Sequence, residues 1–318
     1  MMGLPFTNST CSTCDLNKMH MLLFNKNFEE VSQPLECVHL DLVGPIFPAS
    51  NSGFQYFLTI VDQATSFKTI CLLKLKSDAF EQFVIVKKSM ESLQDRKLKT
   101  LVSDQGGEFV NENFKKLAET DSFVRILFPA KTPQHNGFSE RANCTIIEKA
   151  RCLLNGSNLP KTYWAEAIKT ATFLSNLIPT TSRNNISPYA SWKGLPPRIK
   201  RLRVFGCRAV ISIPRSQRSW KLRPVGAEGV LLEYENENSA SQILHLSNLK
   251  IVIAKHVKFE ENVFPHIQGT TSTKEAWLVP CNGSIETEDI ASNIQPSSPL
   301  SVSESQEDIP CNPSVGSS

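Results

Sequence analysis

Residues Lys131 to Arg151 read KTPQHNGFSERANCTIIEKAR, a loop broken by Pro133 and Gly137 that runs into a helical pattern. The pattern places one carboxylate, Glu140, in the first turn of the helix. A single Glu near a helix start is ordinarily stabilised by the helix dipole and needs no other role. The stretch gains significance from two upstream aspartates that we expect to meet Glu140 in space.

These two aspartates are Asp41 and Asp104, and each is associated with an apolar run of strand type. Asp41 lies within CVHLDLVGP, where β-branched and aliphatic residues predict a buried strand that Gly44-Pro45 ends. An ionised Asp in such a strand is costly unless it is paired or binds a metal. Asp104 follows the apolar run of LKTLVSDQGGEFV, at a strand end where side chains face a crevice.

The spacing of the three carboxylates fits two strands and one helix. The segment between Asp104 and Glu140 has room for a helix over about 111–120, a strand over about 123–128 and a loop. Taken singly, each Asp also suits a strand-end cap or a turn. Together, Asp41, Asp104 and Glu140 supply the hard oxygen ligands that Mg²⁺ and Mn²⁺ prefer, so we expect them to be the catalytic and metal-binding residues.

The motifs around these residues resemble a known family. HLDLVGP, SDQGGEF and TPQHNGFSERANCTI resemble the Asp, Asp, Glu signature of retroviral-type integrases, most closely those of Copia-type (Pseudoviridae) retrotransposons. The similarity extends to TIVDQATSFKTICLLKLKSDAFEQF, LPKTYWAEAIKTATFLSNLIPT and SPYASWKGLPPRIKRLRVFGCRAV, and it covers roughly residues 11–263. Gln105 stands where the family commonly has Asn, which bears on efficiency and not on the class of reaction.

The resemblance implies an α/β fold and a polynucleotidyl transferase activity. The fold is an RNase H-like core, a mixed five-stranded sheet with helices on both faces, followed by a small β-barrel of Src-homology-like type. The activity is two-metal 3′-end processing and strand transfer of element DNA into target DNA, as part of a Pol polyprotein. The implied cofactors are two Mg²⁺ or Mn²⁺ ions, and the implied partners are double-stranded DNA and further copies in a homo-multimer.

The resemblance, together with the composition, implies a division of the chain into four parts. We expect a truncated zinc-binding-like segment at 1–36, a catalytic core with its following helices at 37–197, a basic barrel at 198–265 and a disordered, acidic, Ser-rich tail at 266–318. The net charge is +3 over 318 residues, yet the tail carries −6, which leaves +9 for the remainder. A basic body suits a polyanionic partner. We expect no membrane span and no secretion, and hence reduced thiols in the nucleus or cytoplasm.

Cys11 and Cys14 form CSTC, which resembles half of the family's N-terminal zinc site. The ten residues before Cys11 contain no His, so we expect no zinc to bind in the family's manner. Two interpretations stay open, a remnant of a zinc module and two ordinary free cysteines.

Basic and polar residues are expected to contact nucleic acid at two places. The first group flanks Glu140, where a basic rim beside an acidic centre suits a phosphodiester, and the second lies in a run of nine bases without an acid at 198–223. A solvated helix face and a barrel that only packs on the core are the simpler explanations for the two groups. The residues are Lys131, His135, Asn136, Arg141, Lys149, Arg201, Arg203, Arg218 and Lys221.

Two other functions remain open at the level of sequence. A nuclease that cuts RNA in RNA–DNA hybrids shares the expected fold and acids, but we do not expect it to carry the NGxSER-type stretch or a basic barrel. A truncated, non-catalytic relic that binds DNA is also compatible with the chain.

Overall fold

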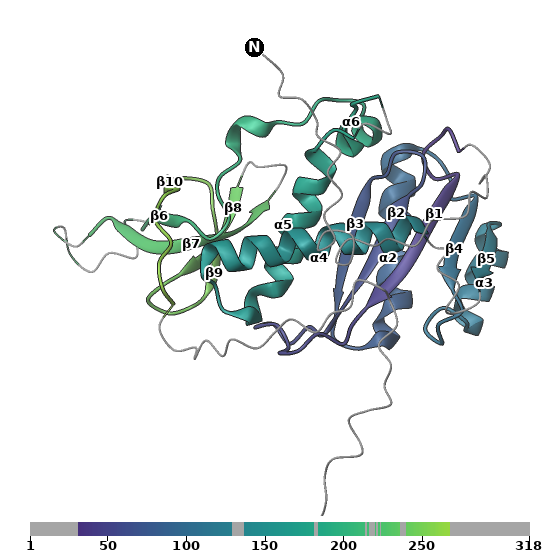
Figure 1. Ribbon diagram of the computed structural model, residues 1–318, viewed down its shortest axis with the longest axis horizontal. Helices are drawn as coiled ribbons and strands as arrows, with labels where there is room; N and C mark the ends of the chain where they lie inside the picture. The colour runs from purple at the N-terminus through teal and green to yellow at the C-terminus, as the bar shows by residue number, and fades with distance from the viewer. Residues whose placement is uncertain are drawn as a thin grey trace, which may run out of the picture. The chain divides into compact units, whose positions relative to one another are not determined.

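The computed structural model contains two five-stranded sheets and the helices that pack on them (Figure 1). It describes residues 31–128, 137–180, 184–213, 224–235 and 240–267, together with the single residues 215, 220 and 222. None of the helices in this part of the chain is long and apolar enough to cross a membrane.

The first sheet has the strand order β3-β2-β1-β4-β5. Its β1 pairs antiparallel with β2 and parallel with β4, β2 pairs antiparallel with β3, and β4 pairs parallel with β5. This mixed pairing confirms the predicted fold class for the core. The strands are β1 (Cys37–Val43), β2 (Tyr56–Asp62), β3 (Lys68–Leu73), β4 (Thr100–Asp104) and β5 (Val124–Phe128).

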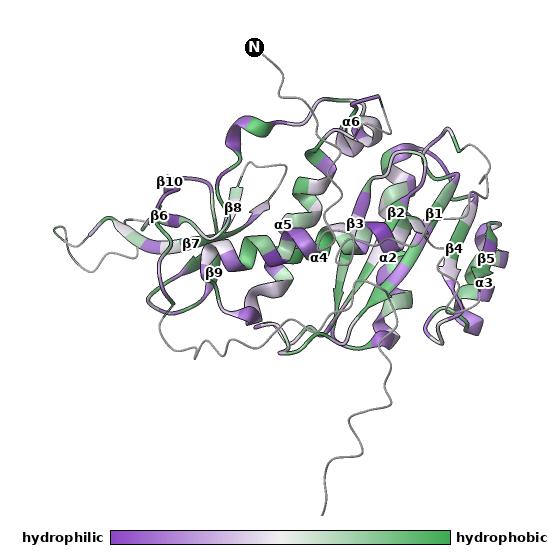
Figure 2. Cartoon of the chain, viewed as in Figure 1, coloured by the Kyte–Doolittle hydropathy of each residue, from purple (hydrophilic) through white to green (hydrophobic). Residues whose placement is uncertain are grey.

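Helices cover both faces of this sheet. Neighbouring residues of a strand point to opposite faces, so both faces carry apolar side chains that the helices bury. Leu58 of β2 belongs to a core cluster with Phe83 and Phe114 of α2 and α3, whereas Phe57 belongs to a second cluster with Ile146 and Trp164 of α4 and α5. Figure 2 shows the strands between the two clusters coloured mainly as hydrophobic. The helices are α2 (Ala79–Gln94), α3 (Glu112–Asp121), α4 (Gly137–Ser157), α5 (Trp164–Leu177) and α6 (Pro188–Lys193).

The second sheet is antiparallel and has the order β10-β6-β7-β8-β9. It shares the α4–α5 cluster with the first sheet, since Val230, Leu232 and Leu244 belong to that cluster. The Thr170 hydroxyl of α5 also donates to the Leu232 carbonyl at 2.9 Å. The strands are β6 (Arg208–Ser212), β7 (Gly226–Glu235), β8 (Ala240–His245), β9 (Ile251–Ala254) and β10 (Val257–Glu260).

In three places the structure differs from what the local sequence pattern predicts. The apolar run KIVIAKHVKF (250–259) is typical of one strand but forms β9 and β10, with Lys255 and His256 between them. Ser77 is a residue type that favours a helix cap, yet it lies inside a short 3-10 turn, and Asp78 accepts from the Leu75 amide at 3.0 Å. The pattern over 159–178 predicts one long helix, whereas the structure has a 3-10 turn followed by α5.

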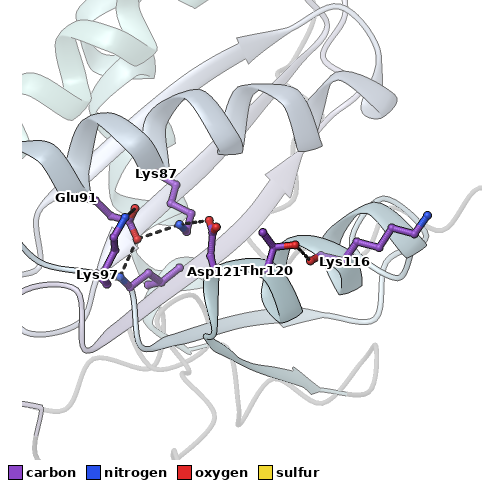
Figure 3. Close-up of polar contacts among 7 residues, drawn as sticks. Lys87, Glu91, Lys97, Lys116, Thr120 and Asp121 are labelled. Atoms are coloured by element: carbon purple, nitrogen blue, oxygen red, sulfur yellow. Dashed lines mark hydrogen bonds and ion pairs between the residues drawn. The ribbon is translucent and has the colours of Figure 1, made fainter.

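A buried ion network joins α2, α3 and the chain that enters β4 (Figure 3). Lys87 Nζ lies 2.9 Å from Glu91 Oε1 and 2.6 Å from Asp121 Oδ2, and the Lys87 side chain is only 3% exposed. Glu91 also accepts from the Leu98 amide at 3.0 Å and lies 3.2 Å from Lys97 Nζ. Burial opposes ionisation of Glu91, but these donors outweigh it and hold the pKa of the carboxyl below its usual value.

We predict that Lys87→Met lowers the free energy of unfolding by about 3 kcal/mol, because it leaves two carboxylates without their buried cation. Lys116→Met is the matched control. Lys116 is an exposed residue of α3 that points away from the network in Figure 3, and its loss should cost less than about 0.5 kcal/mol. Urea unfolding measures both values, and equal losses in the two variants contradict a structural role for the network.

Candidate active site

Asp41 lies in the middle of β1, opposite Thr59 of β2. Its neighbour Leu40 is fully buried among α2 and α3, so Asp41 points to the other face of the sheet, where α4 packs. Asp41 is itself only half-buried. The apolar strand therefore fixes the backbone of Asp41 while its carboxyl reaches the edge of the α4 helix.

Asp104 and Glu140 come from two further elements. Asp104 is the last residue of β4, next to β1 in the sheet, and its Oδ1 accepts from the Gly106 amide at 3.1 Å. Glu140 lies in the first turn of α4, as expected, although that helix already begins at Gly137. Two adjacent strands and one helix thus present one carboxylate each.

Asp41 and Glu140 lie close enough to Asp104 for its charge to act on their protonation. Burial, and then the charges of Asp104 and Glu140, raise the pKa of Asp41 to about 7. Burial and the charge of Asp104 also raise the pKa of Glu140, and Arg141 opposes this shift. The structure therefore brings the sequence-predicted carboxylates together as a centre with an excess of negative charge.

This centre fits a divalent cation by its donors and its charge. Carboxylate oxygens are the ligands of Mg²⁺ and Mn²⁺, and a cation would relieve the repulsion that raises the pKa of Asp41. Within the described part of the chain, no three His, Cys, Asp or Glu side chains converge as the ligands of a single ion.

Asn143 is a site residue that the sequence reasoning missed. Its Nδ2 donates to Asp41 Oδ2 at 2.7 Å, and its Oδ1 accepts from the Thr59 hydroxyl. Asn143 and Thr59 are both buried, so the bridge is shielded from water. The sequence feature that points to Asn143 is its position three residues after Glu140, which places a polar side chain on the same face of the helix.

Asp62, the last residue of β2, uses its carboxylate to hold the backbone of neighbouring segments. Its Oδ1 accepts from the Leu35 amide at 2.8 Å, and its Oδ2 accepts from the amide and the hydroxyl of Thr65 at 2.8 and 2.6 Å. These bonds hold the turn between β2 and β3 and the entry into β1.

The residues expected to bind nucleic acid have different environments. Arg141 and Arg201 are exposed. Lys149, in contrast, is half-buried, and its Nζ donates to Ser175 of α5 at 2.9 Å, so its charge is used in helix packing. Arg203 Nε lies 3.6 Å from Glu261, and its amide donates to the Tyr234 hydroxyl at 3.1 Å, so Arg203 holds the chain onto the second sheet.

Seven predicted site residues lie outside the part of the chain that the structure describes. They are Cys11, Cys14, Lys131, His135, Asn136, Arg218 and Lys221.

The raised pKa of Asp41 leads to a prediction for stability in metal-free buffer. The folded chain binds this proton more tightly than the unfolded chain, so the stabilisation is full below the usual pKa of 3.8 and is lost as pH rises through about 7. The difference between the usual pKa of 3.8 and the folded-state pKa of about 7 limits the loss in the free energy of unfolding to about 4 kcal/mol. In urea unfolding, the free energy of unfolding of Asp41→Asn should therefore fall less between pH 5 and pH 8 than that of the wild type. Parallel pH dependences of the two proteins would contradict the raised pKa of Asp41.

A second prediction concerns the bridge from Asn143. Asn143→Ala removes a donor from Asp41 and leaves the Thr59 hydroxyl buried without its acceptor, which should cost about 1–3 kcal/mol of stability. Affinity for Mn²⁺, measured by calorimetry, should fall by about 10–100-fold. Asn113→Ala, at an exposed position of α3, is the control that should change neither quantity. Unchanged Mn²⁺ affinity in Asn143→Ala would mean that the bridge does not orient Asp41.

Comparisons with known proteins give homologues along most of the chain. A family model described as retroviral polymerase SH3-like domain matches residues 207–272, which confirms the predicted class of the second sheet. The retrovirus-related Pol polyprotein from transposon RE1 of Arabidopsis thaliana is 34% identical over 80% of this chain and 17% of its own length. The corresponding polyprotein from transposon TNT 1-94 of Nicotiana tabacum is 32% identical over 80% of this chain and 19% of its own length.

A solved structure, the HTLV-2 integrase catalytic core domain in complex with magnesium, aligns with a TM-score of 0.38 and 16% identity. The alignment covers 49% of this chain and 95% of that chain. The chain spans less than a fifth of the length of the two polyproteins described above. With its match to the SH3-like family model and its sequence relatives, the chain is homologous to a segment of the retrovirus-related Pol polyproteins of plant Copia-type transposons.

Proposed function

We propose that this chain is the integrase segment of a retrotransposon Pol polyprotein and catalyses 3′-end processing and strand transfer of element DNA into target DNA. The observation that carries the proposal is the meeting of Asp41, Asp104 and Glu140 from β1, β4 and α4, with a pKa of Asp41 raised to about 7. Neighbouring carboxylates whose burial and charges raise the pKa values of Asp41 and Glu140 are unfavourable for folding, and they suggest a catalytic centre that is completed by cations.

The residues of the chain divide the work of such a centre. The charges of Asp104 and Glu140 both act on Asp41. Asp41 would therefore be the ligand that two ions share, and Asp104 and Glu140 would be the other two ligands. Asn143 fixes the orientation of Asp41 through its 2.7 Å bond. Bound Mg²⁺ or Mn²⁺ would supply Lewis-acid activation of the attacking oxygen and charge neutralisation at the leaving oxygen. In-line phosphoryl transfer of this kind needs no covalent nucleophile from the protein.

Double-stranded DNA is the partner in this proposal, both as element ends and as target. Arg141 is exposed directly beside Glu140, and Lys200 and Arg201 are exposed in the basic linker before the second sheet. Such cations favour a phosphate backbone without reading its sequence. From the family resemblance we further propose that the chain assembles into a homo-multimer. The same resemblance suggests a catalytic core at 37–197 and a basic SH3-like part at 198–265.

A second candidate is a DNA-binding relic without catalysis. It is favoured by one observation, the lack of three converging ligand side chains within the described residues. The integrase interpretation accounts for the same observation by ions that share the carboxylates in pairs. The two candidates differ in whether Asp104 and Glu140 have any role beyond DNA binding.

The test is a strand-transfer assay with the purified chain, Mg²⁺ or Mn²⁺ and a labelled duplex that ends in candidate element termini. Joined products should form with the wild type and fall below detection in Asp104→Asn and Glu140→Gln, because each variant removes a metal ligand. Asp95→Asn and Glu148→Gln are matched controls at exposed positions, and both should join DNA at the wild-type rate.

Two outcomes contradict the proposal. Joining that persists in Asp104→Asn and Glu140→Gln would show that these carboxylates are not the catalytic ligands. A wild type that joins nothing, but binds DNA with a salt dependence that both variants share, would identify the chain as a relic.

A further inference from the structure

The first turn of α4 rests on β1 through an aromatic contact outside the carboxylate centre. The rings of His39 and Phe138 are stacked, with centroids 5.0 Å apart and an interplanar angle of 29°. His39 lies two residues before Asp41 on the same face of β1, and Phe138 lies two residues before Glu140. The contact therefore joins the two elements that carry these carboxylates.

His39 is a rigid platform for this contact. It is fully buried, its Nε2 lies 2.9 Å from Gln63 Oε1, and Cys37 Sγ lies 3.7 Å from the same nitrogen. Gln63 is buried as well, and its amide donates to the Cys37 carbonyl at 2.9 Å. The imidazole ring is thus fixed by neighbours from both β1 and the end of β2.

Phe138 does not behave as an ordinary core residue. It is half-buried and belongs to none of the three hydrophobic clusters formed by the described residues. Its ring instead contacts His39 on β1 and lies 5.4 Å from the Arg141 guanidinium carbon, one turn along α4. Both contacts lie at the start of α4.

Glu140 lies between two such attachments. Phe138 attaches the helix to β1 before Glu140, and Asn143 attaches it to Asp41 and Thr59 after Glu140. A helix start held at one point can pivot about it, whereas two points on either side of Glu140 fix its distance from Asp41. Only the second attachment touches the carboxylate centre itself.

We propose that His39 and Phe138 are positioning residues, whose stacked rings set the place of Glu140 relative to Asp41 and thereby the affinity of the centre for divalent cations. The inference rests on the proposed function, because it takes Asp41, Asp104 and Glu140 as the ligands. It assigns no proton transfer to His39, which acts through its ring and its fixed place on β1.

The test compares Phe138→Leu, which keeps an apolar side chain but loses the ring, with Phe138→Tyr, which keeps the ring. Mn²⁺ binding to the full chain is measured from the electron paramagnetic resonance signal of free Mn²⁺. Phe138→Leu should raise the dissociation constant about fivefold, the factor that corresponds to the loss of one aromatic pair, and Phe138→Tyr should leave it unchanged. Hydrogen exchange should speed up at the amides of residues 138–141 in Phe138→Leu and stay unchanged at 150–157.

Phe173→Leu is the matched control, because half-buried Phe173 of α5 makes a similar contact with Tyr234, at 5.3 Å between centroids. Its loss should alter neither Mn²⁺ binding nor exchange in the first turn of α4. His39→Leu should weaken Mn²⁺ binding as much as Phe138→Leu does. The double variant should bind Mn²⁺ as well as the single variant with the lower affinity, because both substitutions remove the same contact.

The outcomes separate this inference from the proposed function. If Asp104→Asn and Glu140→Gln abolish Mn²⁺ binding while Phe138→Leu binds and exchanges like the wild type, the positioning role is overturned and the metal centre stands. If Phe138→Leu and Phe173→Leu weaken Mn²⁺ binding equally, the effect is general destabilisation and the inference is wrong. A wild type that binds no Mn²⁺ overturns the proposed function, and this inference with it.

Discussion

The repulsion among Asp41, Asp104 and Glu140 is the constraint that the rest of the structure has to satisfy. Free carboxylates would move apart, but each of these is held on a different element, and burial together with the charges of Asp104 and Glu140 raises the pKa of Asp41 to about 7. Parallel pairing makes the strands of the first two, β1 and β4, neighbours in the sheet, and α4 brings the third. The energy for this arrangement comes from the apolar cores on the two faces of the sheet.

Helix α4 connects the charged centre to the remainder of the fold. Its first turns contact β1 and β2 through Phe138 and Asn143, while Ile146 and Leu154 continue into the cluster that also contains Val230 and Leu232 of the second sheet. One helix is thus part of the candidate site and of the core that both sheets share.

The sequence was sufficient for the strands and helices that carry the carboxylates, because apolar runs bounded by glycine and proline mark them. It was not sufficient for residues whose role depends on distant partners. Asn143 bonds to Asp41 and Thr59, which lie 102 and 84 positions away in the chain. The contacts of Lys149 with Ser175 and of Arg203 with Glu261 likewise join separate elements, while their predicted binding to nucleic acid stays a prediction. The break between β9 and β10 also left no turn residue for the pattern to detect.

The most direct measurement is anomalous diffraction at the manganese edge from crystals of the full chain soaked in Mn²⁺. We expect anomalous density between the carboxylates of Asp41, Asp104 and Glu140, with Asp41 contacting each ion, and the loss of that density in Asp104→Asn crystals. Density that appears only elsewhere on the molecule, or none at this centre at saturating Mn²⁺, would contradict the claim that these three side chains form a metal-dependent catalytic site.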